Sequence, residues 1–162
     1  MARLNQIYAS EGFFGIGIYH PEQQENLGSL WRSAYIMGAS FIFTIGKNKF
    51  VKESSDVTHA WNKIPLYTHA NFDGFYDALP YSTQLIGVEM HEDAIAVKHF
   101  EHPQRAVYLL GCESSGLPSK VINRCHKLVS LPGNFSLNVA TAGSILLYDR
   151  ITKIPALLPA RA

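Results

Sequence analysis

Cysteine is scarce in this chain of 162 residues, where only Cys112 and Cys125 occur. The two are too far apart for a CxxC pair and too few for a disulfide framework or a structural zinc site, so a reducing cytosol fits best. Apolar runs of membrane-spanning length are also missing, and the N-terminal stretch MARLNQIYASEGFF lacks the apolar core and small-residue cleavage site of a signal peptide. We therefore expect a cytoplasmic protein without a membrane segment.

The chain also lacks an excess of charge of either sign. Lys and Arg number 14 against 13 Asp and Glu, which gives a net charge of +1. No strong overall field exists to hold RNA or an anionic membrane, so a nucleic-acid partner must be met by local patches. With 47% hydrophobic residues, the length fits one domain over residues 1–162. A tail is expected from about residue 153, where the sequence KIPALLPARA carries two prolines.

Short runs rich in β-branched and aromatic residues recur along the chain and predict strands. These runs are Phe13–Tyr19, Ser40–Ile45, Leu66–His69, Gln84–Val88, Ala106–Leu110 and Leu128–Leu131. Helical spacing of apolar residues predicts helices between several of them. The expected helices are Leu27–Gly38, Asp56–Asn62, Phe72–Leu79, Pro118–His126 and Leu137–Ile151. The alternation indicates an α/β domain with a largely parallel sheet flanked by helices, whose ligand sites lie beyond the carboxyl ends of the strands.

The first candidate site is Asn26-Leu-Gly-Ser-Leu-Trp-Arg32, at the start of the helix expected after the first strand. Asn26 is a suitable helix N-cap. Gly28, Arg32 and Tyr35 share one helix face because they are spaced at i, i+4 and i+7. An arginine next to a glycine on that face suggests a close binding partner. From spacing alone, an ordinary surface arginine is the more common explanation.

The second candidate site is Gly111-Cys-Glu-Ser-Ser-Gly-Leu-Pro118, which follows a predicted strand. Gly111 and Gly116 let the backbone approach a ligand closely, and Pro118 is suited to open a helix. Glu113 would lie at the carboxyl end of the strand, although it could also be a solvated turn residue. The segment has a faint similarity to the G-x-S-x-G elbow of serine hydrolases, but it lacks the first glycine and the chain is short for that class.

The third candidate site runs from Val129 to Asp149. A strand stops at Pro132-Gly133, a short polar loop follows, and we expect Ser136 to cap a helix whose first turn carries Asn138. Small residues along that helix permit close packing against another backbone. They are Ala140, Gly143 and Ser144. A capped core helix explains these small residues but not the loop before them.

Taken in order, the three segments resemble the signature motifs of the SpoU (TrmH) class of RNA ribose 2′-O-methyltransferases, within the SPOUT superfamily. The first motif is matched by Asn26, Gly28 and Arg32. The second is matched by Gly111, Glu113, Gly116 and Leu117. The third is matched by Leu131-Pro132-Gly133, Ser136-Leu-Asn-Val139 and Leu147-Tyr148-Asp149. The resemblance covers roughly residues 12–151, and the stretch from Lys47 to His102 contributes little to it.

The resemblance implies a C-terminal segment threaded into a deep trefoil knot, a homodimer, and S-adenosyl-L-methionine as the cofactor. It also implies which residues hold the cofactor. They are the backbone around Gly111 and Leu131, the segment Ser136-Leu137 and, by position rather than by motif, Val88 and Glu89. No metal is expected, because the pair His99 and His102 has no further ligands nearby in the sequence.

The activity that the resemblance implies is in-line transfer of a methyl group to a ribose 2′-hydroxyl of RNA. Arg32 would have the central role. A guanidinium is protonated at any ordinary pH, so we expect Arg32 to hold the adjacent phosphate and stabilise developing alkoxide. Proton acceptance by Arg32 itself or through the phosphate stays open. Glu113 would orient Arg32 or Asn26, while Ser136 and Asn138 would position the cofactor and its loop.

The substrate is expected to be tRNA rather than rRNA, because the chain has no room for the additional domains of many relatives and several minimal members act on tRNA. Basic residues outside the motifs are candidate RNA contacts, although a solvated surface charge is the more common explanation for each one taken singly. They are Lys47, Lys49, Lys52, Arg124, Lys127, Arg150 and Lys153. Two alternatives stay open: a non-catalytic knotted RNA-binding or assembly factor, and methylation of a base nitrogen.

Overall fold

Strands and helices alternate along the computed structural model, which describes residues 12–47, 59–155 and 158–160. The order is β1 (Phe13–Tyr19), α2 (Gln24–Ile36), β2 (Phe41–Ile45), η1 (Ala60–Asn62), β3 (Leu66–His69), α3 (Phe72–Asp77), β4 (Gln84–Val88), β5 (Ile95–Ala96), η2 (Val97–His99), β6 (Arg105–Leu110), α4 (Ser119–Ile122), β7 (Lys127–Ser130) and α5 (Val139–Lys153). The two η elements are single 3-10 turns. This order is the α/β alternation that the sequence predicted.

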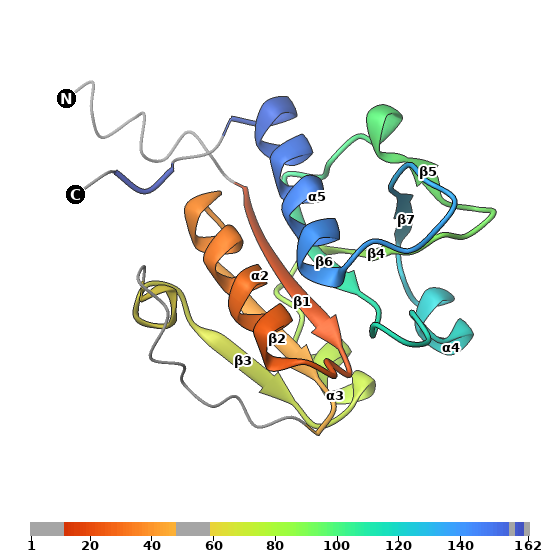
Figure 1. Cartoon of the computed structure of the whole chain (residues 1–162), viewed down its shortest axis with the longest axis horizontal. Coiled ribbons are helices and arrows are strands. Elements are labelled where there is room, and N and C mark those ends of the chain that lie inside the picture. Colours follow the sequence, from red (N-terminus) through yellow and green to blue (C-terminus); the bar gives the residue numbers. More distant parts are fainter. Residues whose placement is uncertain (1–11, 48–58, 156–157, 161–162) are drawn as a thin grey trace.

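One sheet of seven strands organises the molecule, in the order β3-β2-β1-β6-β4-β7-β5. Every pairing in it is parallel. A parallel sheet is apolar on both faces and needs a cover on each. Helices α2 and α5 cover one face (Figure 1), while α3 and α4 pack on the other. The chain therefore forms a single α/β domain of three layers.

Strand β6 shows how the two layers of core arise. Its residues Tyr108 and Leu110 pack in the cluster that contains Leu30 of α2, whereas Val107 and Leu109 pack in the cluster that contains Phe75 of α3. Successive side chains of a strand point to opposite faces, so a continuous apolar run supplies both layers at once. All four β6 side chains are nearly or fully buried.

The strands lie close to where the sequence predicted them. The bounds of β1, β3 and β4 agree with the prediction, and those of β2, β6 and β7 differ by one residue at one or both ends. Strand β5 was missed. Its two residues, Ile95 and Ala96, are both exposed, so they carry none of the apolar alternation that signals a strand.

The predicted helix Pro118–His126 is much shorter in the structure, where α4 ends at Ile122. His126, the residue before β7, is hydrogen-bonded to β4 instead: its backbone N–H donates to the oxygen of Leu85 at 2.8 Å, and its Nδ1 accepts from the Leu85 N–H at 2.9 Å. Part of the predicted helix Asp56–Asn62 lies outside the described residues, and its end forms the 3-10 turn η1 rather than an α-helix.

Helix α5 packs closely against α2, as the small residues of α5 predicted. A Cβ added to Gly143 would lie 2.4 Å from Cδ1 of Leu30, so any other residue there would force the Leu30 side chain to move. The space is filled by a side chain of α2 rather than by its backbone. Ser144 is the next residue of α5, and its Oγ lies 2.8 Å from Ser33 Oγ of α2. The two helices are therefore held at a fixed distance, side by side in Figure 1.

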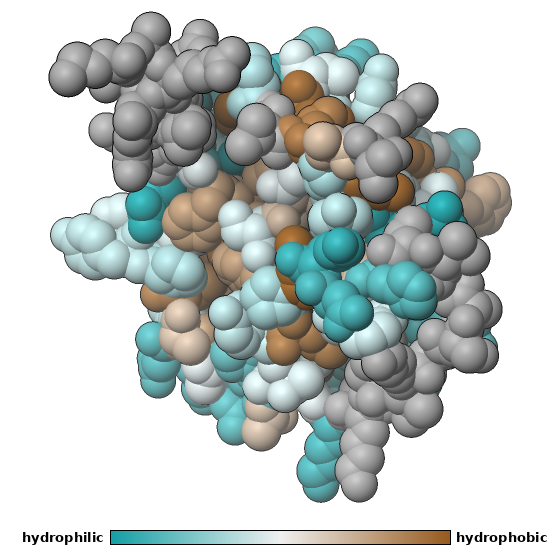
Figure 2. Space-filling model, turned by 90° about the vertical axis from the view of Figure 1, so that its left-hand side faces the viewer, coloured by the Kyte–Doolittle hydropathy of each residue, from teal (hydrophilic) through white to brown (hydrophobic). Residues whose placement is uncertain are grey.

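Apolar side chains also reach the surface. Figure 2 views the molecule from the left-hand side of Figure 1 and shows groups of hydrophobic residues framed by hydrophilic ones. The most exposed large apolar or aromatic residues include Tyr81 at 90%, Phe135 at 87% and Tyr148 at 62%. None of the helices described here combines the length and the hydropathy that crossing a membrane requires.

Candidate active site

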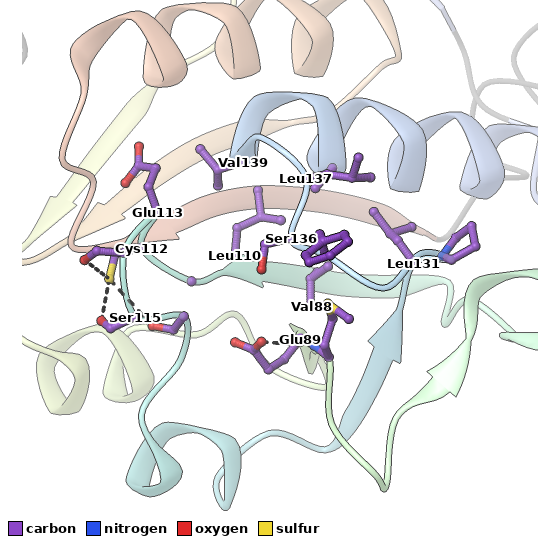
Figure 3. A pocket seen from close by; sticks show the side chains of 17 residues that line it. Val88, Glu89, Leu110, Cys112, Glu113, Ser115, Leu131, Ser136, Leu137 and Val139 are labelled. Carbon is purple, nitrogen blue, oxygen red and sulfur yellow. Dashed lines mark hydrogen bonds between the residues drawn. The ribbon is translucent and has the colours of Figure 1, made fainter.

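A pocket lies beyond the carboxyl ends of β4 and β6, where a parallel sheet places its ligand sites. Its volume is about 280 Å³. Strand residues Val88 and Leu110 form one side, and the loop between β7 and α5 forms the other with Leu131 and Leu137 (Figure 3). The turn after β6, which carries Glu113, closes one end. Three segments that are far apart in sequence thus enclose one space.

Every residue expected to hold the cofactor lines this pocket. They are Val88, Glu89, Gly111, Leu131, Ser136 and Leu137. Of the residues expected to act in catalysis, Glu113 and Ser136 also line it, whereas three do not. Those three are Asn26, Asn138 and Arg32.

The turn after β6 is folded tightly against the end of β4. A Cβ on Gly111 would lie only 2.5 Å from the carbonyl carbon of Gly116, and Gly116 itself has a φ of +66°. Side chains are excluded at the first position by contact and disfavoured at the second by backbone conformation. Both glycines therefore serve the shape of the turn, and at these two positions the backbone faces the pocket.

Glu89 holds this turn in place. Its Oε2 accepts the backbone N–H of Leu117 at 2.8 Å, and its Oε1 accepts the N–H of Met90 at 3.0 Å. The carboxylate thus ties the end of β4 to the end of the glycine turn. Glu89 thus has a structural role that its position in the sequence did not reveal.

A chain of hydrogen bonds joins the three motifs. Asn138 Nδ2 donates to Asn26 Oδ1 at 2.9 Å, and Asn26 Nδ2 donates to Glu113 Oε1 at 2.8 Å. The bonded residues are 112 and 87 positions apart in the sequence. The Asn26 amide donates and accepts at once, so asparagine suits the middle position, and a carboxylate, which only accepts, suits the Glu113 end. The start of α2, the glycine turn and the start of α5 are thereby held together.

Both predicted helix caps are wrong, and the chain of hydrogen bonds explains one of them. Helix α2 begins at Gln24 with Gln23 in the cap position, so Asn26 lies inside the first turn with its amide committed to Glu113 and Asn138. Helix α5 begins at Val139, two residues later than expected, and is capped by Asn138 instead of Ser136. Asn138 Oδ1 accepts the N–H groups of the next helical turn at 3.0 and 3.2 Å. Ser136 stays in the loop and faces the pocket.

Glu113 is the best-connected carboxylate of the site. Partial burial raises its pKa, but the hydrogen bonds from Asn26 and from the backbone N–H groups of Glu113, Glu22 and Gln23 outweigh that effect and leave the pKa below its ordinary value. Glu113 is therefore ionised at neutral pH. Sequence reasoning missed Glu22, whose backbone N–H donates to Glu113 Oε2 at 3.1 Å and whose carboxylate accepts from Ser114 Oγ.

Arg32 lies on the exposed side of α2. Within the described part of the chain, its guanidinium forms no hydrogen bond and no ion pair. The structure therefore does not bring Arg32 to Glu113, one of the two partners that the sequence suggested for that carboxylate. The other partner, Asn26, is the one observed. Arg32 is left available to a group outside this chain.

Arg150, one of the expected RNA contacts, is buried and cannot meet RNA. Only 3% of its surface is exposed. Its guanidinium donates to the oxygens of Pro103 at 2.7 Å and Gln104 at 2.9 Å and to the hydroxyl of Tyr108 at 2.9 Å. Helical spacing from Gly143 and Leu147 places Arg150 on the buried face of α5, a signal that could have identified it.

Two more of these cations are already engaged. Arg124 pairs with Asp73 at 2.7 Å, and Lys153 pairs with Asp149 at 2.8 Å. Lys47 is exposed, and Lys49 and Lys52 lie outside the described residues.

The chemistry of the pocket suits a partly apolar cation. Among the residues described as lining it, none is Lys, Arg or His, whereas Glu89 and Glu113 are acidic. The rest of the wall is mostly apolar side chains and backbone. S-adenosylmethionine has a planar purine and a sulfonium cation, so these residues fit it. No group of three or more His, Cys, Asp or Glu side chains suited to a metal occurs within the described residues.

Solved structures share this fold. A structure solved to explain 2-OH methylation of C/U34 on tRNA matches with a TM-score of 0.76 and 25% identity, over 88% of this chain and 97% of the other. The SpoU methyltransferase AviRb from Streptomyces viridochromogenes matches with a TM-score of 0.79 and 26% identity, over 93% of this chain and 63% of AviRb. An AdoMet-bound rRNA methyltransferase from Sinorhizobium meliloti has the same fold, with a TM-score of 0.80 and 23% identity, over 90% and 58% of the two chains. Fold and pocket thus define an α/β methyltransferase.

The family follows from the sequence match. The model of the SpoU rRNA Methylase family matches residues 14–148, so the chain belongs to that family, whose cofactor is S-adenosylmethionine. A tRNA (cytidine(34)-2′-O)-methyltransferase from Ancylobacter novellus is 26% identical over 145 residues, which are 84% of this chain and 90% of that protein. A 23S rRNA (uridine(2479)-2′-O)-methyltransferase from Streptomyces viridochromogenes is 28% identical over 160 residues, 91% of this chain but only 55% of that protein.

Proposed function

We propose that this protein methylates a ribose 2′-hydroxyl of RNA, with tRNA preferred over rRNA. The observation that carries the proposal is the hydrogen-bond chain from Asn138 through Asn26 to Glu113, because it joins the helix that bears Arg32 to the loop and turn of the cofactor pocket. The same chain fixes the start of α2, whose exposed side carries Arg32, relative to the pocket.

The residues divide the work in this proposal. When bound, S-adenosylmethionine supplies an electrophilic methyl group. The pocket residues Val88, Gly111 and Leu131 hold the cofactor, and Ser136 faces it from the loop. Glu113 and Asn26 are positioning residues that fix the start of α2. Arg32 binds the phosphate beside the reacting ribose and stabilises negative charge that develops on its 2′-oxygen.

The preference for tRNA is supported by the extent of the likeness. This chain spans 90% of the relative named for tRNA and 55% of the one named for 23S rRNA. The structural neighbour concerned with C/U34 of tRNA is likewise covered over 97% of its length. We infer that the substrate is a tRNA and that the protein acts in the cytoplasm.

We also propose that the functional unit is a homodimer formed through the exposed faces of α2 and α5. Ile36 of α2 is 47% exposed, and Ile145 and Tyr148 of α5 are 40% and 62% exposed. Contact between Ser33 and Ser144 joins the two helices, so these apolar residues lie on neighbouring elements of one face. Exposed apolar side chains gathered in this way are typical of a protein interface.

A trefoil knot at the C-terminus is the last part of the proposal. The final turns of α5 are fastened to the chain between β5 and β6: Arg150 bonds the oxygens of Pro103 and Gln104, and Lys153 bonds those of Val97 and Phe100. Strand β5 also pairs with β7, which precedes α5. These contacts support a C-terminal segment threaded past the 97–104 segment.

The test is methyl transfer from radiolabelled S-adenosylmethionine to tRNA and rRNA from a strain that lacks the gene, followed by nucleoside mass spectrometry. We expect 2′-O-methylated nucleosides from tRNA. Arg32→Ala should lower kcat by about a hundredfold, as loss of one electrostatic contact in a transition state typically does, while cofactor affinity measured by calorimetry is unchanged. Near-wild-type transfer by Arg32→Ala, or a methyl group on a base nitrogen, would refute the proposal.

A further inference from the structure

A second cavity lies at the β3 edge of the sheet, on the face covered by α3. Its volume is about 370 Å³, and it shares no lining residue with the cofactor pocket. Its walls are the side chains of Phe41, Phe43, Tyr67, His69 and Phe75, with the turn that follows α3. We call it the edge pocket. Neither the family motifs nor the proposed chemistry uses any of these residues.

The edge pocket is built from rings at fixed angles. Phe43 stacks on Phe75 with ring centroids 4.6 Å apart and planes 17° apart, and both side chains are almost fully buried. His69 meets Phe75 edge-on at 5.4 Å, and Tyr67 meets Phe41 edge-on at 5.8 Å. Tyr67 is 53% exposed, so it leaves one part of the ring open to solvent. Aromatic walls of this kind favour a flat ring as their ligand.

The electrostatics of the edge pocket favour a neutral ligand with polar edges. None of its described lining residues is Asp, Glu, Lys or Arg. Burial lowers the pKa of His69, so the imidazole is neutral at neutral pH and offers one N–H donor and one nitrogen acceptor. A nucleobase is flat, neutral and edged with donors and acceptors, and single-stranded RNA is bound by stacking its bases on aromatic side chains.

The position of the edge pocket connects it with the proposed active site. Tyr19, Ile45 and His69 are in register across β1, β2 and β3, so His69 lies level with the strand end from which the chain continues toward Asn26. Strand β3 is three neighbours away from β6 in the sheet, which at the usual strand spacing is about 14 Å. A few nucleotides of single-stranded RNA span that distance.

A cation is available for the RNA backbone along this route. The N–H of Gly46 donates to the oxygen of His69 at 2.8 Å, and the exposed Lys47 is the next residue. Its charge beside the carboxyl end of β3 favours a phosphate there. Lys47 was among the RNA contacts expected from the sequence.

We propose that the edge pocket binds one unstacked nucleobase of the RNA substrate, a few nucleotides from the methylated ribose, with Tyr67 stacking on the base. The inference rests on the proposed function, since it takes the substrate to be RNA. The edge pocket would help select RNA segments whose bases are free of pairing.

The test measures binding of a fluorescently labelled single-stranded RNA of about ten nucleotides, a length within the usual range for such sites, to the full chain and three variants. Tyr67→Ala should weaken binding about tenfold, the effect expected when one stacking contact is lost. Tyr67→Phe keeps the ring and should stay within about twofold of the wild type, as should the matched control Tyr81→Ala, whose side chain is 90% exposed. The slope of log Kd against log salt should not change, because phosphate contacts are untouched.

Equal binding by Tyr67→Ala and the wild type would overturn the proposal, as would no binding by the wild type or a loss in Tyr67→Phe as large as in Tyr67→Ala. A methylation assay separates this failure from failure of the proposed function. If Tyr67→Ala raises the KM for tRNA and leaves kcat unchanged, both stand. If the binding results hold but no RNA accepts a methyl group, the edge pocket stands and the proposed function fails.

Discussion

A buried polar network fastens α5 to the rest of the domain, and Tyr108→Phe tests it by removing one oxygen atom. The Tyr108 hydroxyl is fully buried and lies 2.6 Å from Nδ1 of His102 and 2.9 Å from the guanidinium of Arg150. Burial raises the pKa of Tyr108 to about 12, so the hydroxyl is protonated. Arg150 can only donate, and the single hydroxyl proton therefore goes to His102. His102 in turn donates from Nε2 to Asp149 at 2.8 Å.

The magnitude follows from what each partner loses. Without the hydroxyl, His102 Nδ1 is a buried acceptor with no partner within the described structure, which costs about 1–3 kcal/mol. Arg150 loses one of three bonds but keeps the oxygens of Pro103 and Gln104, so its loss is at the lower end of the range for a charged donor, about 1.5 kcal/mol. We expect Tyr108→Phe to lower the free energy of unfolding by about 3 kcal/mol. For a domain of this size that corresponds to a fall in Tm of about 6 to 12 °C.

Urea and thermal unfolding at one fixed protein concentration measure this change, because association would otherwise shift the apparent stability. Tyr81→Phe is the matched control: the same atom is removed from a residue that is 90% exposed, and the expected change is below about 0.5 kcal/mol. If Tyr108→Phe were as stable as Tyr81→Phe, the network would contribute no net stability and the reasoning would be wrong.

Two further predictions concern the pocket and the same network. Gly111→Ala should weaken S-adenosylmethionine binding at least about tenfold in calorimetry, because the added Cβ would lie 2.5 Å from the backbone of Gly116. Gly28→Ala is the control and should leave binding unchanged, because a Cβ at Gly28 meets nothing within 4 Å. Equal affinities of the two variants would contradict the tight turn. Burial lowers the pKa of His102 in the folded protein, so the folded state favours the neutral imidazole. The stability that neutral His102 contributes is therefore present above pH 6.5, the value of the unfolded chain, and is lost as the pH falls from there through the folded-state pKa. Denaturant unfolding at pH 7.5 and 5.5 should show a smaller acid loss in His102→Gln than in the wild type, and identical losses would exclude His102 as the cause.

Much of the fold could be predicted because local pattern and final structure agree. Strands β1 and β4 are largely apolar runs that the sheet buries, whereas β3 is a short run at the sheet edge that stays partly exposed; the bounds of all three agree with the prediction. Agreement fails where a long-range contact replaces a local one. The predicted helix ran to His126, yet the backbone and the ring of His126 both bond Leu85 of β4, so the chain has already left the helix when it reaches this residue.

The candidate site divides in the same way. The sequence could indicate which residues share one pocket because the motifs place glycines and the serine loop at strand ends, which the parallel sheet brings to one edge. The hydrogen-bond chain could not be predicted from the sequence, because helix capping is the usual local role of an asparagine such as Asn26. Nothing in the neighbouring sequence shows that the Asn26 amide bonds Glu113 and Asn138 instead. The prediction that Arg150 contacts RNA was wrong because it rested on the charge of the residue, whereas helical spacing places Arg150 on the buried face of α5.

The two ends of α5 make different contacts, and the first of them fixes one end of the loop between β7 and α5, which stays open. At its start, Asn138 caps the helix and bonds Asn26, while β7 fixes the other end of the loop in the sheet. At its far end, Asp149 and Arg150 fasten the helix to the 97–104 segment. Between β7 and Asn138 the side chains of the loop pack little against the domain, since Phe135 is 87% and Leu137 44% exposed. The loop ends are therefore set before a ligand arrives, which lowers the entropy cost of binding, and its exposed apolar side chains are left for the ligand or a partner surface to cover.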